Sequence, residues 1–219
     1  MMITVSKEDY LKAIATAEGE GQHVISATIA TWLGVTRPAV TAALKRLKKD
    51  RMVRVSKDGH VQLTSAGRQV AERTLFRHHL IERMLTEIFE MPWCDVHQEA
   101  ERLEHVVSAS FEKRLVKKLG KNDICPHGNS SSVRSDAERR KSGLHPLSEA
   151  AVGKKYQVKS VYERDNKLLQ FFDQEGIRPG VTLAILAKGY DGTTTLAIGN
   201  RSLRLGLPAA QRVWVGKLK

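Results

Sequence analysis

The sequence predicts a mainly α-helical protein with a small β part: a winged helix-turn-helix, two long helices and a C-terminal β-barrel. Three observations predict this order. Two short helical stretches flank Gly34, and an Asp58-Gly59 turn between alternating segments follows them. Two long stretches then repeat apolar residues at helical spacing. Short strand-like runs separated by turn signals occupy the chain beyond residue 146.

The N-terminal part is predicted to hold three helices and a hairpin. Ser6 is placed to cap the first helix, and Thr36 to cap the third, which has Pro38 in its first turn, where a missing N–H costs nothing. Two helices joined by a short glycine-containing turn form the helix-turn-helix layout, and the hairpin is the expected wing. The expected elements are helices over 6–18 and 26–33, a third helix from Thr36, and strands over 52–55 and 60–63.

Two long helices are expected next. Thr64 caps one that runs to about Glu90, Pro92 interrupts the pattern, and a second helix runs from about Asp95 to Leu119. Long apolar faces after a small N-terminal domain are usually buried against a partner subunit. We therefore expect a homodimer.

The C-terminal third is expected to be β-structured. Residues 129–143 are polar and charged without an apolar period, which predicts a flexible linker. Turn signals then separate short strands around one short helix over 168–175, a pattern typical of a small barrel. Strands are expected over 156–161, 182–187, 194–198, 202–205 and 213–215. The expected domains are a DNA-binding domain at 1–73, a metal-binding and dimerisation domain at 74–128, a linker at 129–145 and a barrel at 146–219.

Composition favours a polyanionic partner. The 219 residues hold 36 Lys and Arg against 24 Asp and Glu, a formal charge of +12, so nucleic acid is the first expectation and an ordinary basic protein the alternative. No apolar run approaches the ~20 residues of a membrane span. Two cysteines are too few for a disulfide framework, although one bridge between Cys94 and Cys125 remains an alternative. We expect a cytoplasmic protein with no membrane partner and no organic cofactor.

The third helix and the wing concentrate positive charge. Residues 37–58 contain eight Lys and Arg against two Asp, and such cations neutralise phosphates. The start of the third helix would enter the major groove of double-stranded operator DNA, where Arg37 could contact a guanine. The alternative is a solvated basic helix. The DNA-binding candidates are Ser26, Thr36, Arg37, Pro38, Ala39, Thr41, Lys45, Arg46 and Lys57.

Potential metal ligands recur at helical spacing. His97, Glu101, Glu104 and His105 fall at i, i+4, i+7 and i+8, which predicts that they share one helix face. Carboxylates and imidazoles are common ligands of divalent metals, and taken together they favour a metal site. Each residue taken singly has an ordinary explanation as a surface charge or a buried polar group. Further candidates are Asp9, His78, Glu82, Cys125 and His127.

Four segments resemble the diphtheria toxin repressor family of iron and manganese regulators. They are EDYLKAI at 8–14, RHHLIER at 77–83, VHQEAERLEH at 96–105 and CPHGN at 125–129. The resemblance covers nearly the whole chain in order. The C-terminal part is similar to the SH3-like domain, akin to ferrous transport protein A (FeoA-like), that many members carry.

The resemblance implies two metal sites. The primary site would use Asp9, Glu101, Glu104 and His105. The second would use His78 and Glu82 with either His97 or the Cys125/His127 pair, and the barrel would add Glu163 together with Asn166 or Asp165. Our hypothesis for the mechanism is that metal ties the first helix to the dimer helix and fixes the spacing of two recognition helices. Repression of metal-uptake genes is the implied role.

Departures from the family pattern indicate which metal the site prefers. Iron-type members have Met at the Asp9 position and Cys at the Glu101 position, whereas both are carboxylates here, and hard oxygen ligands favour Mn²⁺. We therefore predict a manganese regulator to which Fe²⁺ is also able to bind. Lys12 stands where short manganese regulators have an acid, which argues against their bridged two-metal arrangement. Ser130–Ser132 replace the usual Pro-Ile-Pro and loosen the linker.

Two other function classes are weighed. A metal hydrolase could use the same His and Glu residues, but the sequence has no HExxH, G-x-S-x-G or P-loop motif, so we expect no enzyme. A winged-helix regulator could instead sense an organic ligand or redox state, and Cys94 or Cys125 would then matter more than Glu104.

Overall fold

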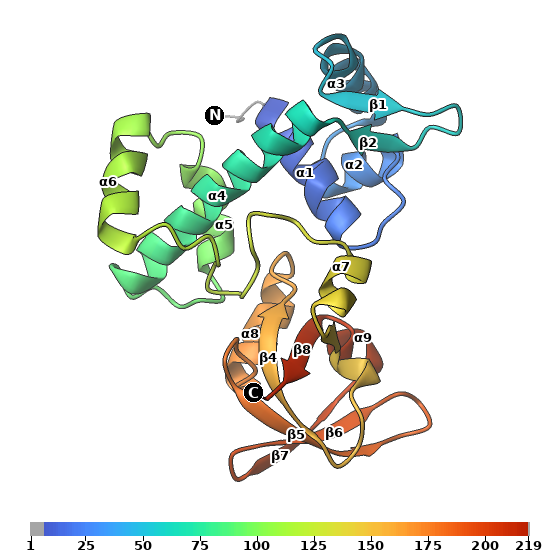
Figure 1. Ribbon diagram of the computed structural model, residues 1–219, viewed down its shortest axis with the longest axis vertical. Coiled ribbons are helices and arrows are strands. Elements are labelled where there is room, and N and C mark those ends of the chain that lie inside the picture. The colour runs from blue at the N-terminus through green and yellow to red at the C-terminus, as the bar shows by residue number, and fades with distance from the viewer. Residues whose placement is uncertain (1–6, 219) are drawn as a thin grey trace. The chain divides into compact units, whose positions relative to one another are not determined.

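The computed structural model describes residues 7–218, which form two compact units (Figure 1). The first comprises the chain up to His78 together with Ser131–Asp136. The second comprises His79–Ser130 together with the chain from Ala137 onward. Among the described residues, no helix is both long and apolar enough to cross a membrane.

The first unit contains the predicted winged helix-turn-helix. Its core is formed by apolar side chains of every element, including Leu11, Ile14, Ile29, Leu47 and Val61. The hairpin strands pair antiparallel from Val53 opposite Leu63 to Val55 opposite Val61. The predicted cap Ser6 lies outside the described residues. The elements are α1 (Lys7–Gly19), α2 (Ser26–Leu33), α3 (Arg37–Lys49), β1 (Val53–Val55), β2 (Val61–Leu63) and the start of α4 (Ser65–Glu87).

Local signals set the turn between α2 and α3. Gly34 ends α2 in the left-handed region at φ 62°, where a side chain would be strained. The Thr36 hydroxyl then accepts a hydrogen bond from the Ala39 N–H at 3.4 Å and caps α3. The stripe of Val40, Leu44 and Leu47 is buried, so the opposite face of α3 is turned to solvent.

The second long helix predicted over 95–119 is wrong as one element. The structure divides it into α5 (Val96–Leu103) and α6 (Ala109–Leu119). Ser108 is extended and its hydroxyl accepts a hydrogen bond from the Phe111 N–H at 3.2 Å, so it starts a new helix. Glu104 and His105 therefore lie at the end of α5 and in the turn beyond it, rather than in mid-helix.

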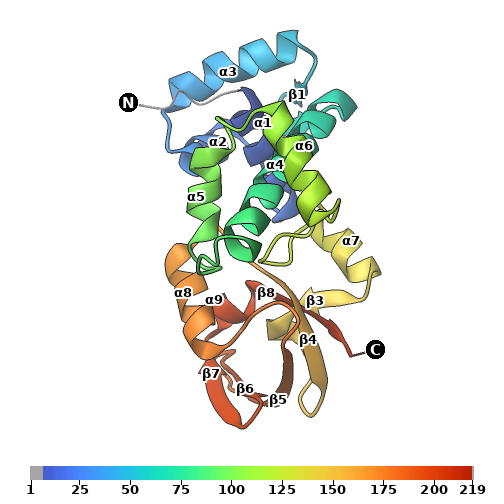
Figure 2. The ribbon, with the colours of Figure 1, turned by 90° about the vertical axis from the view of Figure 1, so that its left-hand side faces the viewer.

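The C-terminal β-structure lies in the second unit. Strands of the described chain form an antiparallel sheet in the order β3-β8-β4-β5-β6-β7, and α8 packs against its apolar side through Leu169 and Phe172 (Figure 2). The short β3 and α9 were not predicted. The elements are β3 (Leu144–Pro146), β4 (Lys155–Val161), α8 (Asn166–Glu175), β5 (Thr182–Lys188), β6 (Thr194–Ile198), β7 (Arg201–Leu205), α9 (Leu207–Ala210) and β8 (Val213–Lys217), with a 3-10 turn at Leu147–Glu149.

The segment predicted as a flexible linker contains a short helix, α7 (Asp136–Lys141). Its basic side chains have partners on the barrel. Arg140 makes a bidentate ion pair with Glu149 at 2.5 and 2.7 Å, and the Arg139 guanidinium lies 4.9 Å from the centre of the Trp214 ring. These contacts order a segment whose composition alone predicts none.

Candidate metal centre and DNA-reading surface

Four potential ligands from separate parts of the chain meet inside the second unit. Glu82 comes from α4, Cys125 and His127 from the turn that follows α6, and Glu163 from the segment between β4 and α8. Glu82 and His127 are fully buried, and Cys125 and Glu163 are 4% and 9% exposed. We call these four residues the Glu82 cluster.

The atoms of the Glu82 cluster are spaced as ligands of one ion. His127 Nδ1 lies 3.6 Å from Glu82 Oε1 and 3.5 Å from Glu163 Oε2. Cys125 Sγ lies 3.3 Å from Glu163 Oε2 and 3.8 Å from His127 Nδ1. Bonds to a transition-metal ion are about 2.0–2.3 Å long, which puts neighbouring ligand atoms about 3–4 Å apart. The donor set of two carboxylates, an imidazole and a thiol therefore fits a divalent metal.

Backbone geometry explains why the CPHGN turn presents its ligands here. The Cys125 N–H donates to the Asn129 carbonyl at 2.9 Å, and the Val161 N–H donates to the His127 carbonyl at 2.9 Å, which fixes the turn to the end of β4. Gly128 has φ 84°, and a Cβ there would lie 2.0 Å from the Lys159 carbonyl oxygen. Only glycine allows this close approach.

Neighbouring groups orient two of the ligands. His127 Nε2 lies 2.8 Å from the Trp93 carbonyl oxygen, so it carries the proton of that hydrogen bond and Nδ1 faces the carboxylates. The Asn129 side-chain amide donates to Glu163 Oε2 at 2.7 Å and to the Val161 carbonyl at 3.1 Å. Such partners hold metal ligands in one rotamer and raise their basicity.

Without a metal, protons on the cluster balance its negative charge. Burial opposes a charged His127, but Glu82 and Glu163 outweigh it and raise the pKa of His127 to about 10. Burial and Glu82 act to raise the pKa of Glu163, yet the His127 hydrogen bond and the charges of His97 and His127 bring it below its ordinary value. Burial, followed by the charges of Glu163 and Glu82, raises the pKa of the Cys125 thiol well above 9.0. A metal at this site would replace the protons of the imidazole and the thiol.

One potential ligand was missed from the sequence. Ligand atoms of His79, Glu82, Cys125 and Glu163 all lie within 4.8 Å of one another. His79 is buried, and its Nδ1 lies 3.0 Å from the Asp123 carbonyl oxygen. Its position three residues before Glu82 on a helix was the available signal, because residues at i and i+3 share a face.

The alternative partners predicted for Glu82 are both close to it. Besides the Cys125/His127 pair, His97 Nδ1 lies 3.0 Å from Glu82 Oε1 and 4.0 Å from Glu163 Oε1. His97 Nε2 is also 3.8 Å from Glu101 Oε1, across one turn of α5. That His97 is itself a metal ligand stays a prediction.

The predicted primary ligands are divided between the units. Glu104 is buried, and its Oε1 lies 3.6 Å from His105 Nε2 in the second unit, where the Glu101 side chain is 45% exposed. Asp9 is on α1 in the first unit, and His78 is the residue of α4 at which that unit ends. The primary set therefore stays a prediction from the sequence.

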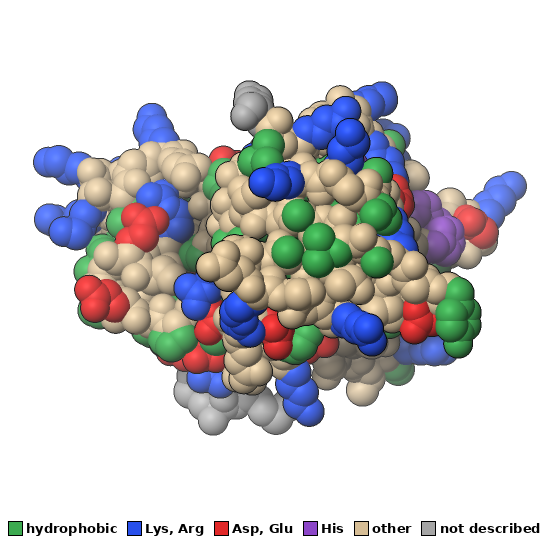
Figure 3. Space-filling view, turned by 90° about the horizontal axis from the view of Figure 1, so that it is seen from below, with side chains coloured by type: hydrophobic (Ala, Val, Ile, Leu, Met, Phe, Trp, Pro, Cys, Tyr) green, Lys and Arg blue, Asp and Glu red, His purple; other side chains and the backbone are tan. Residues whose placement is uncertain are grey.

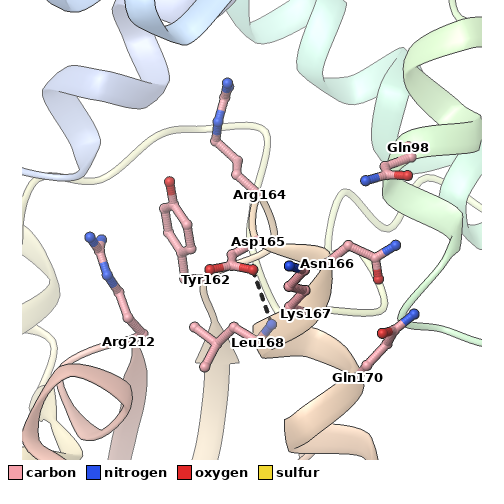
Figure 4. Close-up of a pocket in the computed structure, with 9 residues that line it drawn as sticks. All are labelled: Gln98, Tyr162, Arg164, Asp165, Asn166, Lys167, Leu168, Gln170 and Arg212. Atoms are coloured by element: carbon pink, nitrogen blue, oxygen red, sulfur yellow. Dashed lines mark hydrogen bonds between the residues drawn. The ribbon is translucent and has the colours of Figure 1, made fainter.

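The other predicted barrel ligands, Asp165 and Asn166, line an open pocket (Figure 4). The Asp165 carboxylate accepts a hydrogen bond from the Leu168 N–H at 3.1 Å and so caps α8. The Arg212 guanidinium lies 4.3 Å from the centre of the Tyr162 ring at the same pocket. Asp165 thus has a structural task in the helix cap, which accounts for its type at this position.

The DNA-reading candidates of α3 form an exposed surface. Arg37, Pro38, Ala39, Thr41, Lys45 and Arg46 are all exposed, as is Lys57 on the wing, and Ser26 at the start of α2 is half-buried. The sequence of α3 has five cations and no acid. On the face shown in Figure 3, by contrast, Lys and Arg side chains project at separate places with acidic side chains among them. The uniform sign of α3 is what a phosphate backbone requires.

Models of known families match three stretches of the chain. Residues 2–61 match the iron dependent repressor N-terminal DNA-binding domain, and residues 64–132 match the iron dependent repressor metal-binding and dimerisation domain. Residues 145–217 match the FeoA domain.

Full-length relatives agree with these matches. The chain is 30% identical to the iron-dependent repressor IdeR of Mycobacterium tuberculosis over 96% of both proteins. It is 39% identical to the diphtheria toxin repressor of Corynebacterium diphtheriae over 56% of this chain and 54% of that one.

Solved structures give the same result. A manganese-dependent transcriptional repressor in complex with manganese superposes with a TM-score of 0.86, at 30% identity over 97% of this chain and all of that one. The manganese regulator SloR superposes with a TM-score of 0.78, at 29% identity over 99% and 100%. The winged helix-turn-helix, the helical metal-binding region and the FeoA-like barrel thus occur in the order found in these regulators. The chain belongs to the diphtheria toxin repressor family of metal-dependent, DNA-binding transcriptional regulators.

Proposed function

We propose that this regulator is a manganese sensor, with Fe²⁺ as a weaker activator, and that it represses metal-uptake genes from the cytoplasm. The observation that carries the metal proposal is the convergence of buried oxygen, nitrogen and sulfur donors in the Glu82 cluster. When bound, the metal supplies a divalent positive charge that offsets the clustered carboxylates.

The second proposed centre consists of Asp9, Glu101, Glu104 and His105. Its support is the donor chemistry: three carboxylates repel one another without a cation, and hard oxygen donors suit Mn²⁺. Iron-type members resembled by the sequence have softer sulfur donors at two of these positions. The manganese-dependent repressor and SloR are named for manganese and IdeR for iron, so the ligand substitutions are what favours manganese here.

We further propose that a second copy of the chain covers the helical region to form a homodimer. Large apolar side chains are exposed there, with Phe89 at 64%, Val106 at 75% and Phe111 at 43%. Phe89 lies in the turn after α4, Val106 in the turn after α5 and Phe111 on α6, and exposed apolar side chains of this size are typical of an interface. The matched family model is described as a dimerisation domain, which supports a second copy as the occupant. A dimer would place two α3 helices one helical turn of double-stranded operator DNA apart, or a multiple of that spacing.

The experiment is DNA binding followed by fluorescence anisotropy. Fragments selected from random DNA are titrated in chelator and then in Mn²⁺. We expect tight binding only with Mn²⁺, and loss of that response in Glu104→Ala. The matched control is Glu99→Ala on the adjoining helix α5. The Glu99 side chain pairs with the surface residue Arg102 at 3.1 Å, so this substitution should leave the response unchanged. Equal binding in chelator and Mn²⁺ would contradict the proposal and favour a regulator of another signal.

Metal choice is tested with the same fragments under anaerobic conditions. The wild-type protein should reach half-activation at a lower free concentration of Mn²⁺ than of Fe²⁺. A double variant, Asp9→Met with Glu101→Cys, should narrow or reverse that order because sulfur donors suit Fe²⁺ better than Mn²⁺. An unchanged order would show that these two positions do not set the preference.

A further inference from the structure

Trp93 connects the barrel to the Glu82 cluster. It lies between α4 and α5, is 7% exposed, and packs in the core of the second unit with barrel residues such as Leu169 and Phe172. Its indole N–H donates a hydrogen bond to the carboxylate of Asp173 on α8. Arg178, which follows α8, pairs with the same carboxylate and lies 5.5 Å from the centre of the Trp93 ring. We call Trp93, Asp173 and Arg178 the tryptophan clasp.

The other side of Trp93 faces a potential metal ligand. This ligand is His127: the Trp93 carbonyl oxygen lies 2.8 Å from His127 Nε2, and the centres of the indole and imidazole rings are 5.3 Å apart. The hydrogen bond fixes the imidazole so that Nδ1 points toward Cys125, Glu82 and Glu163. A shift of the Trp93 backbone would rotate or release the imidazole. The clasp and the ligand orientation are therefore linked through one residue.

We propose that Trp93 is a positioning residue for the metal centre: the tryptophan clasp holds its backbone where the carbonyl aims His127 Nδ1 at the ion. This inference rests on the proposed metal role of the Glu82 cluster. A buried indole N–H also needs a partner for stability alone, so the test must separate positioning from folding. Mutation of a group that hydrogen-bonds to a metal ligand typically lowers metal affinity by about 10- to 100-fold.

The test uses the full-length protein and Co²⁺ as a probe, because a cobalt–thiolate bond gives a charge-transfer absorption that reports Cys125. All variants carry Glu104→Ala to silence the other proposed centre. Trp93→Phe keeps the buried ring but removes the donor, and Asp173→Ala removes the acceptor. Asp173→Asn retains an oxygen that can accept the indole N–H. The matched control is Glu175→Gln, also on α8, which alters only an exposed pair with Arg201 at 3.3 Å.

We expect Trp93→Phe and Asp173→Ala to bind Co²⁺ about 10- to 100-fold more weakly, with the thiolate band still present at saturation. Asp173→Asn and Glu175→Gln should stay within about threefold of the parent protein. Thermal unfolding checks that each variant is folded. If Trp93→Phe does not fold, the comparison of Asp173→Asn with Asp173→Ala tests the positioning role by itself. Wild-type affinity in both Trp93→Phe and Asp173→Ala would overturn the inference, as would equal losses in the Asn and Ala variants.

Failure of the metal centre itself gives a different result. Cys125→Ser should abolish the charge-transfer band. If it leaves the cobalt spectrum unchanged, the Glu82 cluster is not the metal centre and the positioning inference falls with it. If the band disappears but the clasp variants bind like the parent, only the positioning inference is wrong.

Discussion

Metal binding at the Glu82 cluster should be steeply dependent on pH, because two of its ligands hold protons in the metal-free protein. The buried Cys125 thiol lies beside Glu163 and Glu82, and its pKa is well above 9.0. Burial opposes the charge on His127, but the same carboxylates raise its pKa to about 10. Both protons must leave before the sulfur and Nδ1 can bind a metal.

The size of the effect follows from proton competition. Below the two pKa values, each ligand exchanges one proton for its metal bond, so the apparent affinity should rise about 100-fold for each pH unit. At pH 7, removing the proton from His127, whose pKa is about 10, takes ~4 kcal/mol from the free energy of metal binding, at about 1.4 kcal/mol per pH unit. Neutral solution therefore weakens the site by about a thousandfold through this one residue.

The assay is titration calorimetry with Mn²⁺ in buffers of different ionisation enthalpy, in a Glu104→Ala background so that only one proposed centre responds. The wild-type cluster should release about two protons per metal, and Cys125→Ser about one. Glu175→Gln is the control and should match the parent. Release of no protons, or the same affinity at pH 6.5 and pH 8, would refute this account of the cluster.

Three further predictions concern stability, the turn and the DNA surface. Because the pKa of His127 is about 10 in the fold and 6.5 in the unfolded chain, its protonation stabilises the metal-free protein fully below pH 6.5, and this contribution is lost as the pH rises to about 10. The free energy of unfolding measured in urea should therefore fall over this pH range, and His127→Gln should make that fall smaller. Gly128→Ala should lower metal affinity and stability by ~1–3 kcal/mol, seen in calorimetry and urea unfolding, because its methyl group meets the Lys159 carbonyl. Lys45→Ala on exposed α3 should reduce the slope of log affinity for DNA against log salt by about one, measured by anisotropy.

Local chemistry made the first unit predictable from its sequence. Gly34, Thr36 and Pro38 each act within one helical turn, and the Asp58-Gly59 turn sets the wing within a few residues. The division between α5 and α6 was missed for the complementary reason. The apolar spacing continues across it, and Ser108 is read as a cap only when the chain before it is known to be extended. Likewise, α7 depends on Glu149 and Trp214, which lie outside its own sequence window.

The candidate site shows the same limit at a larger scale. Glu82 and His97 could be read as ligands from their own helices, but the sequence left open whether His97 or the Cys125/His127 pair joined Glu82. In the fold His97 and His127 both lie near Glu82, and Glu163, contributed by the barrel, lies near His97, His127 and Cys125. Periodicity within one helix carries no information about a carboxylate contributed 81 residues later by a different domain, so Glu163 was predicted only from the family resemblance.

The two proposed metal centres differ in their ligand atoms, so we expect one to set the choice of metal and the other to set the pH range of binding. The Cys125 sulfur makes the Glu82 cluster the softer site, and such a donor set does not by itself favour Mn²⁺ over Zn²⁺ or Fe²⁺. The set of Asp9, Glu101, Glu104 and His105 has no sulfur, so any preference for a hard ion must arise there. The metal affinity of the Glu82 cluster at neutral pH is lowered further because Cys125 and His127 must each lose a proton before they bind the metal. Metal choice should therefore follow substitutions at Asp9 and Glu101, whereas substitutions at Cys125 and His127 should change the pH range over which the second metal binds.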